Sequence, residues 1–374
     1  MNTTVTFGNH QTNFIGIDLH CDNAVICVKQ AAYDPKKGIH TRTLVTKRIS
    51  VIDGAQKVME FLRPYCQDQE HIAVVESTYN WYFLADAFEQ VDWVLRIADP
   101  STVSQANIKA ADDKTDAEYL AERACCNSLK HYQPMAKDDR ALRDLCRTRM
   151  VTVQQRAQCK ITLVNYYRNH LSRKISADKL FEHYEVKITD TGRLEPSVIS
   201  DFDNRNSQMK VAMQLELIAL FNRQIEELDQ TIHAQCKDLE LAKLCKTIPG
   251  CGPVLSSIIA TEIGTIDRFP SAADFVSYCR LCSTSKLSNG KSKGMGNAKN
   301  GNAYLSWALT EVANIAVRCN PTIRKIYDRL LNKAKGLRVK AIRTLAAKIA
   351  RGLYQALRQK LPFSTQRCFG GLCD

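Results

Sequence analysis

The stretch FIGIDL, residues 14–19, is the part of the sequence from which the fold is best predicted. Four of its six residues are apolar and two are β-branched, so it predicts a buried strand. Gly16 leaves room for close backbone packing, and Asp18 interrupts the apolar run. A carboxylate in a buried strand is costly unless it is paired or bound to a cation. Taken alone, Asp18 is explained equally well as a turn residue at the strand end, because Asp favours turns.

Further short strands and helices follow this stretch. Two more β-type runs come next, and the turn-forming residues 34–38 between these two runs indicate an antiparallel meander. A helix with Asp53 as its N-cap and then alternating strands and helices follow, so we expect a mixed sheet with helices on its faces. The additional strands are expected at residues 24–30, 41–50, 71–76 and 93–98, and the helices at 53–65, 79–90 and 113–125.

Four carboxylates fall at comparable places in this arrangement. Asp18 ends the first strand, Glu76 ends the strand at 71–76, and Asp113 and Asp116 begin a helix on one face. Four acids around one point would repel strongly unless divalent cations neutralised them. Hard oxygen ligands suit Mg²⁺ or Mn²⁺, and two such ions are usual for phosphodiester chemistry. Helix capping is the simpler explanation of the Asp113/Asp116 pair, but the four-acid pattern resembles the RNase H-like nucleases, in particular the junction resolvase RuvC.

Composition indicates a soluble chain of two or three domains. The 374 residues allow that number at about 150 residues each, and no apolar run approaches the roughly 20 residues of a membrane span. We see no signal peptide. The 15 cysteines, an odd number scattered along the chain, favour reduced thiols in a cytosolic protein. The lone CxxC at Cys279 and Cys282 is interpreted as structural, since no second pair stands at zinc spacing.

The charge is unevenly distributed. The chain carries a net charge of +13, yet residues 1–140 hold 15 Lys/Arg against 19 Asp/Glu. An acidic front and a basic back favour a metal site in one part and a polyanion on the other. Residues 330–374 hold ten Lys/Arg and one acid in a helical pattern, which favours nucleic acid over a plain solvated face. The basic residues of this segment that we expect to bind nucleic acid are Arg338, Lys340, Arg343, Lys348 and Arg351.

The middle of the chain changes to long-helix periodicity. Residues 141–171 and 218–239 carry apolar side chains at three- and four-residue spacing, which indicates an antiparallel coiled coil or a dimerisation stalk. An ordinary helical bundle explains the pattern equally well. The turn IPGCGP at 248–253 then resembles a helix-hairpin-helix, in which exposed amides such as those at Gly250 and Gly252 hold a phosphate.

The segment at residues 285–302 is rich in Gly, Ser, Asn and Lys, and has no apolar period. We therefore expect a mobile loop without regular structure. A flexible linker is the simplest explanation. The loop also carries Ser288 close to Lys291, Lys293 and Lys299, and an exposed serine beside lysines is a plausible nucleophile towards phosphorus.

Taken in order, these motifs resemble the transposases of insertion-sequence family one-hundred-and-ten (IS-one-ten) and the related Piv-type DNA invertases. The resemblance rests on GID, VVES and DDKTDAEYLA in the front part, and on IPGCGP, ATEIG, RFPSAADFVSYCRL and SNGKSKGMGNAKNGNAYL in the back part. It implies that Asp18, Glu76, Asp113 and Asp116 form the metal-binding set, with Mg²⁺ or Mn²⁺ as cofactor. It also implies that Ser288 is the nucleophile, joined covalently to DNA.

The resemblance further implies partners and a location. A bridge-type guide RNA would pair with both donor and target DNA. The protein would act as a homodimer that assembles into a tetramer, in the bacterial cytosol or nucleoid. Three positions depart from the family pattern: Asp112, which competes for the role of Asp113; Arg280, where the family has Gly; and Ser306, where it has Arg.

We therefore expect an α/β plus α protein. The expected parts are a RuvC-like catalytic domain at 1–140, a coiled-coil stalk at 141–240, a helical domain with the serine loop at 241–335 and a basic helical tail at 336–374. A protein-only Piv-like invertase and a RuvC-like resolvase that does not use Ser288 remain alternatives. An actin-like ATPase or sugar kinase is disfavoured because no Gly- and Thr-rich turn follows Asp18. A non-catalytic nucleic-acid-binding protein is disfavoured by the four carboxylates.

Overall fold

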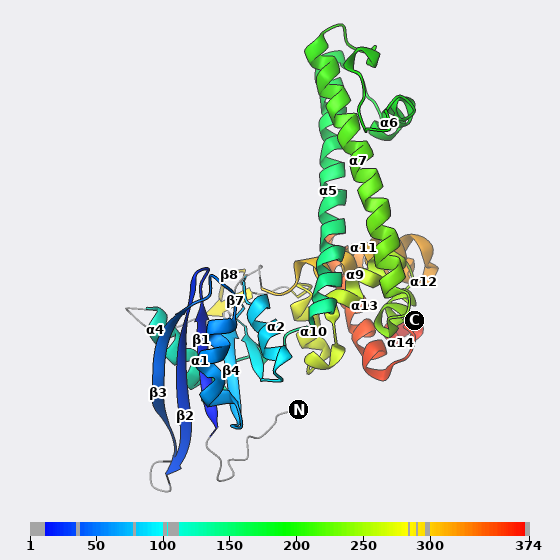
Figure 1. The fold of residues 1–374 in the computed structure, drawn as a ribbon. Helices are drawn as coiled ribbons and strands as arrows, with labels where there is room; N and C mark the ends of the chain where they lie inside the picture. The colour runs from blue at the N-terminus through cyan, green and yellow to red at the C-terminus, as the bar shows by residue number, and fades with distance from the viewer. Residues whose placement is uncertain are drawn as a thin grey trace. The chain divides into compact units, whose positions relative to one another are not determined.

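A computed structural model describes residues 12–34, 38–77, 80–99, 103, 112–282, 285–288, 291–295 and 300–370. The chain divides into two compact units, Met1–Lys137 and Asp138–Asp374. The first unit combines a sheet with helices, and the second consists of helices and one short two-stranded sheet (Figure 1). The predicted α/β plus α class is confirmed. Within the described residues, no helix combines the length and apolar content that crossing a bilayer requires.

The first unit is built on a six-stranded mixed sheet with the order β3-β2-β1-β4-β5-β6. The first three strands pair antiparallel, which confirms the predicted meander, whereas β1, β4 and β5 are parallel to one another. β6 closes the edge antiparallel to β5. The strands are β1 (Asn13–Leu19), β2 (Asn23–Asp34), β3 (Gly38–Ser50), β4 (His71–Glu76), β5 (Leu95–Ala98) and β6 (His131–Tyr132).

Helices cover both faces of this sheet. Alternate residues of β1 point to opposite faces, so Ile15 and Ile17 enter one core, shared with α1 (Gln56–Cys66) and α2 (Tyr82–Gln90). On the other face, Gly16 lies directly under α4 (Asp113–Cys125). The predicted N-cap Asp53 is wrong, because α1 is capped at Ala55 without a side-chain hydrogen bond. The carboxylate of Asp53 instead pairs with Lys57 at 3.1 Å.

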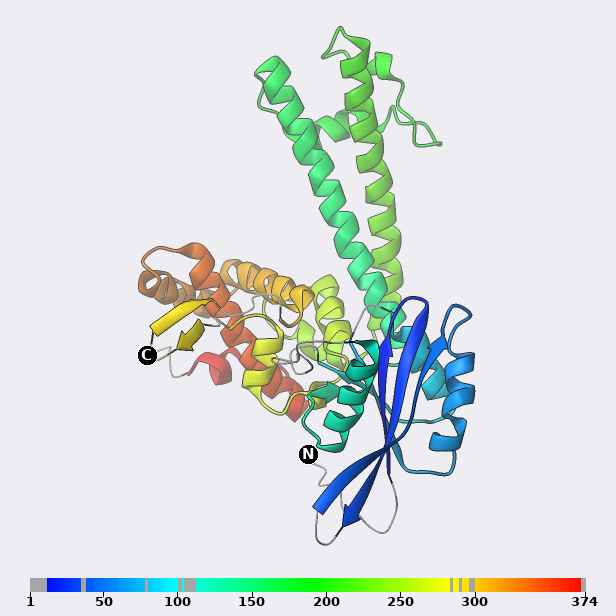
Figure 2. The same ribbon diagram turned by 90° about the vertical axis from the view of Figure 1, so that its left-hand side faces the viewer.

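Two long antiparallel helices, α5 (Lys137–Leu171) and α7 (Arg205–Cys236), extend from the second unit (Figures 1 and 2). Hydrogen bonds join them along their length, from Arg149 to Asp229 and from Arg156 to Asn222. At their far end, α6 (Ala177–Glu185) and η1 (Pro196–Val198) complete a separate apolar core with the two helices. The sequence pattern of the two long helices did not predict this core.

A helical body makes up the rest of the second unit around one large core. The described parts of the serine segment form an antiparallel pair of strands, β7 and β8, so the expectation of a loop without regular structure is wrong there. Every cysteine among the described residues is a free thiol. The elements are α8 (Glu240–Lys246), α9 (Pro253–Ile263), η2 (Ile266–Arg268), α10 (Ala272–Tyr278), β7 (Ser285–Ser288), β8 (Lys291–Met295), α11 (Ala303–Cys319), α12 (Pro321–Lys333), α13 (Arg338–Gln359) and α14 (Thr365–Phe369).

Candidate active site

The carboxylates of the first unit gather at one edge of its sheet. β1 and β4 are parallel neighbours, so their carboxyl ends, with Asp18 and Glu76, lie at the same edge. The first turn of α4 adds Asp113 and Asp116. It reaches the sheet because Gly16 has no side chain, which lets the α4 backbone approach β1 closely. The sheet topology and one glycine thus bring together residues that are about a hundred positions apart in the chain.

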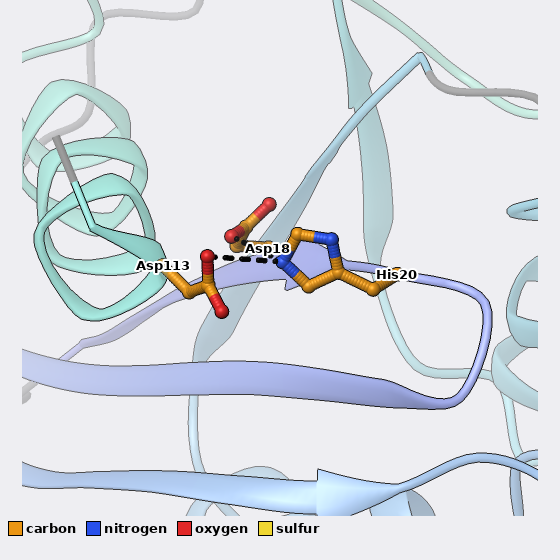
Figure 3. A group of neighbouring side chains, drawn as sticks. All are labelled: Asp18, His20 and Asp113. Carbon is orange, nitrogen blue, oxygen red and sulfur yellow. Dashed lines mark hydrogen bonds and ion pairs between the residues drawn. The ribbon is translucent and has the colours of Figure 1, made fainter.

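A histidine that sequence analysis did not select lies within this group. The Nε2 atom of His20 is 3.0 Å from Oδ2 of Asp18 and 3.4 Å from Oδ1 of Asp113 (Figure 3). One possible ligand atom from each of these three side chains lies within 4.8 Å of the others, a spacing that could hold a metal ion. The sequence signal for His20 was its position two residues after Asp18, because residues i and i+2 of an extended chain share a face.

The four carboxylates are close enough for their charges to shift the pKa values within the group. Burial raises the pKa of Asp18, whose side chain is only 16% exposed, and the charges of Asp116 and Asp113 raise it further while His20 lowers it. Burial also raises the pKa of Glu76, with added repulsion from Asp18 and Asp116. Clustered carboxylates whose ionisation is unfavourable are stabilised by a bound cation.

The neighbouring Asp112 and Asp113 have different roles. Asp112 is the N-cap of α4, since its carboxylate accepts a hydrogen bond from the Thr115 amide at 2.7 Å, and this bond lowers its pKa. Asp113 points to the cluster and also accepts a 2.6 Å hydrogen bond from Arg48, which lowers the pKa of Asp113. Capping therefore accounts for Asp112, and the structure places Asp113 with Asp18.

The predicted nucleophile lies in the second unit. Ser288 ends β7 and pairs with Lys291, the first residue of β8, which also contains Lys293. Lys299 lies outside the described residues. The serine and two of the lysines are therefore neighbours along one hairpin, whereas the carboxylates belong to the first unit.

The two glycines of the IPGCGP turn differ in their surroundings. Gly250 has a positive φ of 83°, and a Cβ there would lie 2.7 Å from the Ala316 amide nitrogen, so packing against α11 explains it. Gly252 is exposed, has open space around it and caps α9 without a side-chain hydrogen bond. Only Gly252 is therefore placed where a ligand could approach freely.

The predicted basic residues near the C-terminus all lie on α13. The opposite face of this helix is buried in the same core as α9 and α11. Lys348 is partly exposed, and the exposed members are Arg338, Lys340, Arg343 and Arg351.

Comparison with known proteins supplies the family. Residues 242–328 match the model described as "Transposase IS116/IS110/IS902 family". The chain is also 24% identical over 281 residues to the "Transposase for insertion sequence element IS1328" of Yersinia enterocolitica, which covers 74% of this chain and 78% of that protein. Both matches support an IS110-family transposase. The resemblance seen in the sequence and the predicted role as a DNA transposase are thus confirmed.

A second similar protein is the "Insertion element IS110 uncharacterized 43.6 kDa protein" of Streptomyces coelicolor. It is 28% identical over 115 residues, which cover 31% of this chain and 28% of that protein. The family model spans the two glycines of the turn and Ser288, and it ends before α13. The four carboxylates lie outside residues 242–328, which the family model matches.

Proposed function

We propose that this transposase cuts and rejoins DNA strands with Ser288 as nucleophile and a divalent cation, Mg²⁺ or Mn²⁺, held by Asp18, Glu76, Asp113 and Asp116. The observation that carries the proposal is the convergence of these four carboxylates, from two strands and a helix, at one edge of the sheet. The family match supports the DNA substrate.

The donor set fits a hard cation. Carboxylate oxygens are the ligands that Mg²⁺ and Mn²⁺ prefer, and His20 is a further candidate donor at the same edge. When bound, such an ion polarises a phosphodiester and stabilises negative charge on its oxygens. The strand order, with three antiparallel strands followed by parallel β4 and β5, supports an RNase H-like classification of this unit.

The chemical step assigned to Ser288 is a transesterification. Its Oγ forms a bond to phosphorus, the bond from phosphorus to the 3′ oxygen breaks, and the serine proton leaves with the 3′ hydroxyl. The protein is then joined to the 5′ phosphate. Because one phosphodiester replaces another, the free energy of the cleaved bond is retained for rejoining the strands, and no nucleoside triphosphate is consumed. Lys291 and Lys293 lie on the same hairpin and would balance developing charge.

The same proposal includes nucleic-acid partners and assembly. The exposed basic residues of α13 would bind phosphates of donor DNA, target DNA and a bridge-type guide RNA, in which base pairing supplies the sequence specificity. The antiparallel α5/α7 pair would act as a coiled-coil stalk in a dimer that assembles into a tetramer. In such an assembly, Ser288 of one subunit could serve the carboxylates of another. Sequencing of copurified RNA tests the guide, and recombination on naked DNA without RNA would favour a Piv-like, protein-only enzyme.

A denaturing gel with end-labelled DNA tests the nucleophile. We expect the native protein with Mg²⁺ to form a covalent adduct, Ser288→Ala to form none, and Ser285→Ala on the same strand to behave as native. A mixture of Ser288→Ala and Asp18→Ala proteins should regain activity if subunits share the site. Strand cleavage by native protein without any adduct would remove Ser288 from the mechanism and favour a RuvC-like resolvase.

A further inference from the structure

A buried carboxylate in the second unit has no part in the proposed chemistry. Glu262, on α9, is 2% exposed. It accepts two hydrogen bonds from Arg147 of α5, at 2.6 Å from Nε and 2.8 Å from the terminal nitrogen. The guanidinium of Arg147 also lies 4.6 Å from the ring centroid of Tyr304. Burial of such a pair is tolerated only where further hydrogen bonds satisfy the remaining acceptors.

The further hydrogen bond comes from the end of the serine segment. The side-chain amide of Asn302 donates to Glu262 at 2.6 Å, while its oxygen accepts from the Leu305 amide at 3.0 Å and so caps α11. The backbone amide of Asn302 donates to the Tyr278 carbonyl at 2.6 Å. The preceding Gly301 has a φ of 91°, and a Cβ there would lie 2.4 Å from that carbonyl.

The other end of the segment is bound to the same place. Arg280, which follows α10, donates from Nε to the Gly301 carbonyl at 2.8 Å. Its own carbonyl accepts a hydrogen bond from Arg343 of α13 at 2.5 Å. Residues that precede the serine segment are therefore hydrogen-bonded to its last two residues, and the side chain of Asn302 is held by the buried Glu262.

We propose that Asn302 and Glu262 are positioning residues for the serine segment, and that Arg147 ties this anchor to α5 at the base of the long helix pair. The proposal rests on the proposed function of Ser288, because its catalytic consequence is the placement of that hydroxyl. Glu262 therefore has a structural role. It accepts a hydrogen bond from Asn302, the residue that ends the serine segment and caps α11.

Asn302→Asp tests the anchor without removing the helix cap. Asp is as good an N-cap as Asn, but it sets a carboxylate against Glu262 at a distance that the native structure fills with an amide hydrogen bond of 2.6 Å. The matched control is Asn320→Asp, because Asn320 caps α12 through Ile323 at 3.0 Å in the same way. Adding Glu262→Gln to Asn302→Asp restores one donor, one carboxylate and the native net charge of the pair, at the loss of one of the two hydrogen bonds from Arg147, which shares the Oε2 acceptor with Asn302.

Three quantities are measured: the rate of adduct formation on labelled DNA, amide hydrogen exchange of Ser285–Ser288 and Lys291–Met295, and the melting temperature. We expect Asn302→Asp to slow adduct formation at least about tenfold, because displacements near 1 Å cost up to about 100-fold. Exchange in both strands should accelerate, Asn320→Asp should change neither quantity, and the double variant should recover part of the rate. If Asn302→Asp fails to fold, Asn302→Ser keeps a capping oxygen and removes the amide donor.

Native adduct formation and native exchange rates in Asn302→Asp would overturn the positioning role. Absence of an adduct with native protein is a different result, since it refutes the proposed function of Ser288. The exchange measurement then still decides whether Glu262 and Asn302 anchor the segment.

Discussion

Gly16→Ala should separate the carboxylates of the candidate active site without touching any of them. A Cβ at Gly16 would lie 2.0 Å from the Ala117 carbonyl oxygen and 2.6 Å from the Ala121 nitrogen. Both atoms belong to the backbone of α4, so no side-chain rotation relieves the clash. Ordinary contact begins at 3.4 Å, so α4 must move by about the difference from 2.0 Å, or about 1.4 Å.

That movement has two consequences. Overpacking of this kind destabilises a core by about 1–3 kcal/mol, here in a region where α4 packs its Ala117 and Ala121 against small side chains of β2. Because α4 carries Asp113 and Asp116, the same shift withdraws two of the four carboxylates from Asp18. We expect weaker divalent binding and DNA cleavage reduced about 100-fold, the usual effect of a displacement near 1 Å.

Denaturant unfolding, calorimetric titration with Mn²⁺ and cleavage of labelled DNA measure these effects. Gly370→Ala is the control, since nothing lies within 4 Å of a Cβ at that position. Native stability together with native Mn²⁺ affinity in Gly16→Ala would refute the packing argument. Reduced stability with unchanged Mn²⁺ affinity would refute only the link between α4 and the metal site.

Three further predictions concern single side chains. The pKa of Asp18 is raised in the folded protein, so its carboxyl costs the metal-free protein stability as the pH rises from about 4, where unfolded Asp ionises, through the raised folded value. Asp18→Asn should remove this contribution and, at neutral pH without divalent ions, melt at a higher temperature than native protein, while losing the stabilisation by Mn²⁺. Arg48→Ala should raise the pKa of Asp113, followed by NMR titration, and increase Mn²⁺ affinity by less than about fivefold, since exposed ion pairs are weak. Arg280→Gly should leave the melting temperature within about 3 °C of native but accelerate amide exchange in β7 and β8, because the hydrogen bond to Gly301 is lost.

The core of the first unit was predictable because its signals are local. The apolar, β-branched residues of FIGIDL mark a strand, and the turn-forming sequence at residues 34–38, between the two β-type runs that follow, favours an antiparallel meander. The carboxyl-end positions of Asp18 and Glu76 follow from parallel pairing of β1 with β4. The helix that begins at Asp113 was placed to the residue. The sequence pattern does not predict how closely α4 approaches β1. Gly16 determines this distance through its contact with a helix about a hundred residues later in the chain.

The missed features depend on pairings far apart in the chain. Arg147 and Glu262 are 115 positions apart, and neither residue type is unusual on a helix. The hairpin at Ser288 was missed for another reason: its composition indicates a linker, yet Asn289-Gly290 between two short runs is the sequence that favours a two-residue hairpin. The polar composition was given more weight than that local signal.

Arg280 shows how a departure from the family pattern gains a physical explanation. The backbone there has a φ of 53°, the left-handed region in which glycine is unstrained and other residues are disfavoured by roughly 1 kcal/mol. The family glycine therefore fits the turn after α10, and an arginine carries a conformational cost. Its side chain, however, donates a hydrogen bond to the carbonyl of Gly301, near the end of the serine segment. A glycine would close the turn more easily but would remove this hydrogen bond, leaving Asn302 held by Tyr278 and Glu262. Arginine at position 280 thus carries a backbone cost that glycine would not, but it adds a hydrogen bond to the end of the segment that carries Ser288.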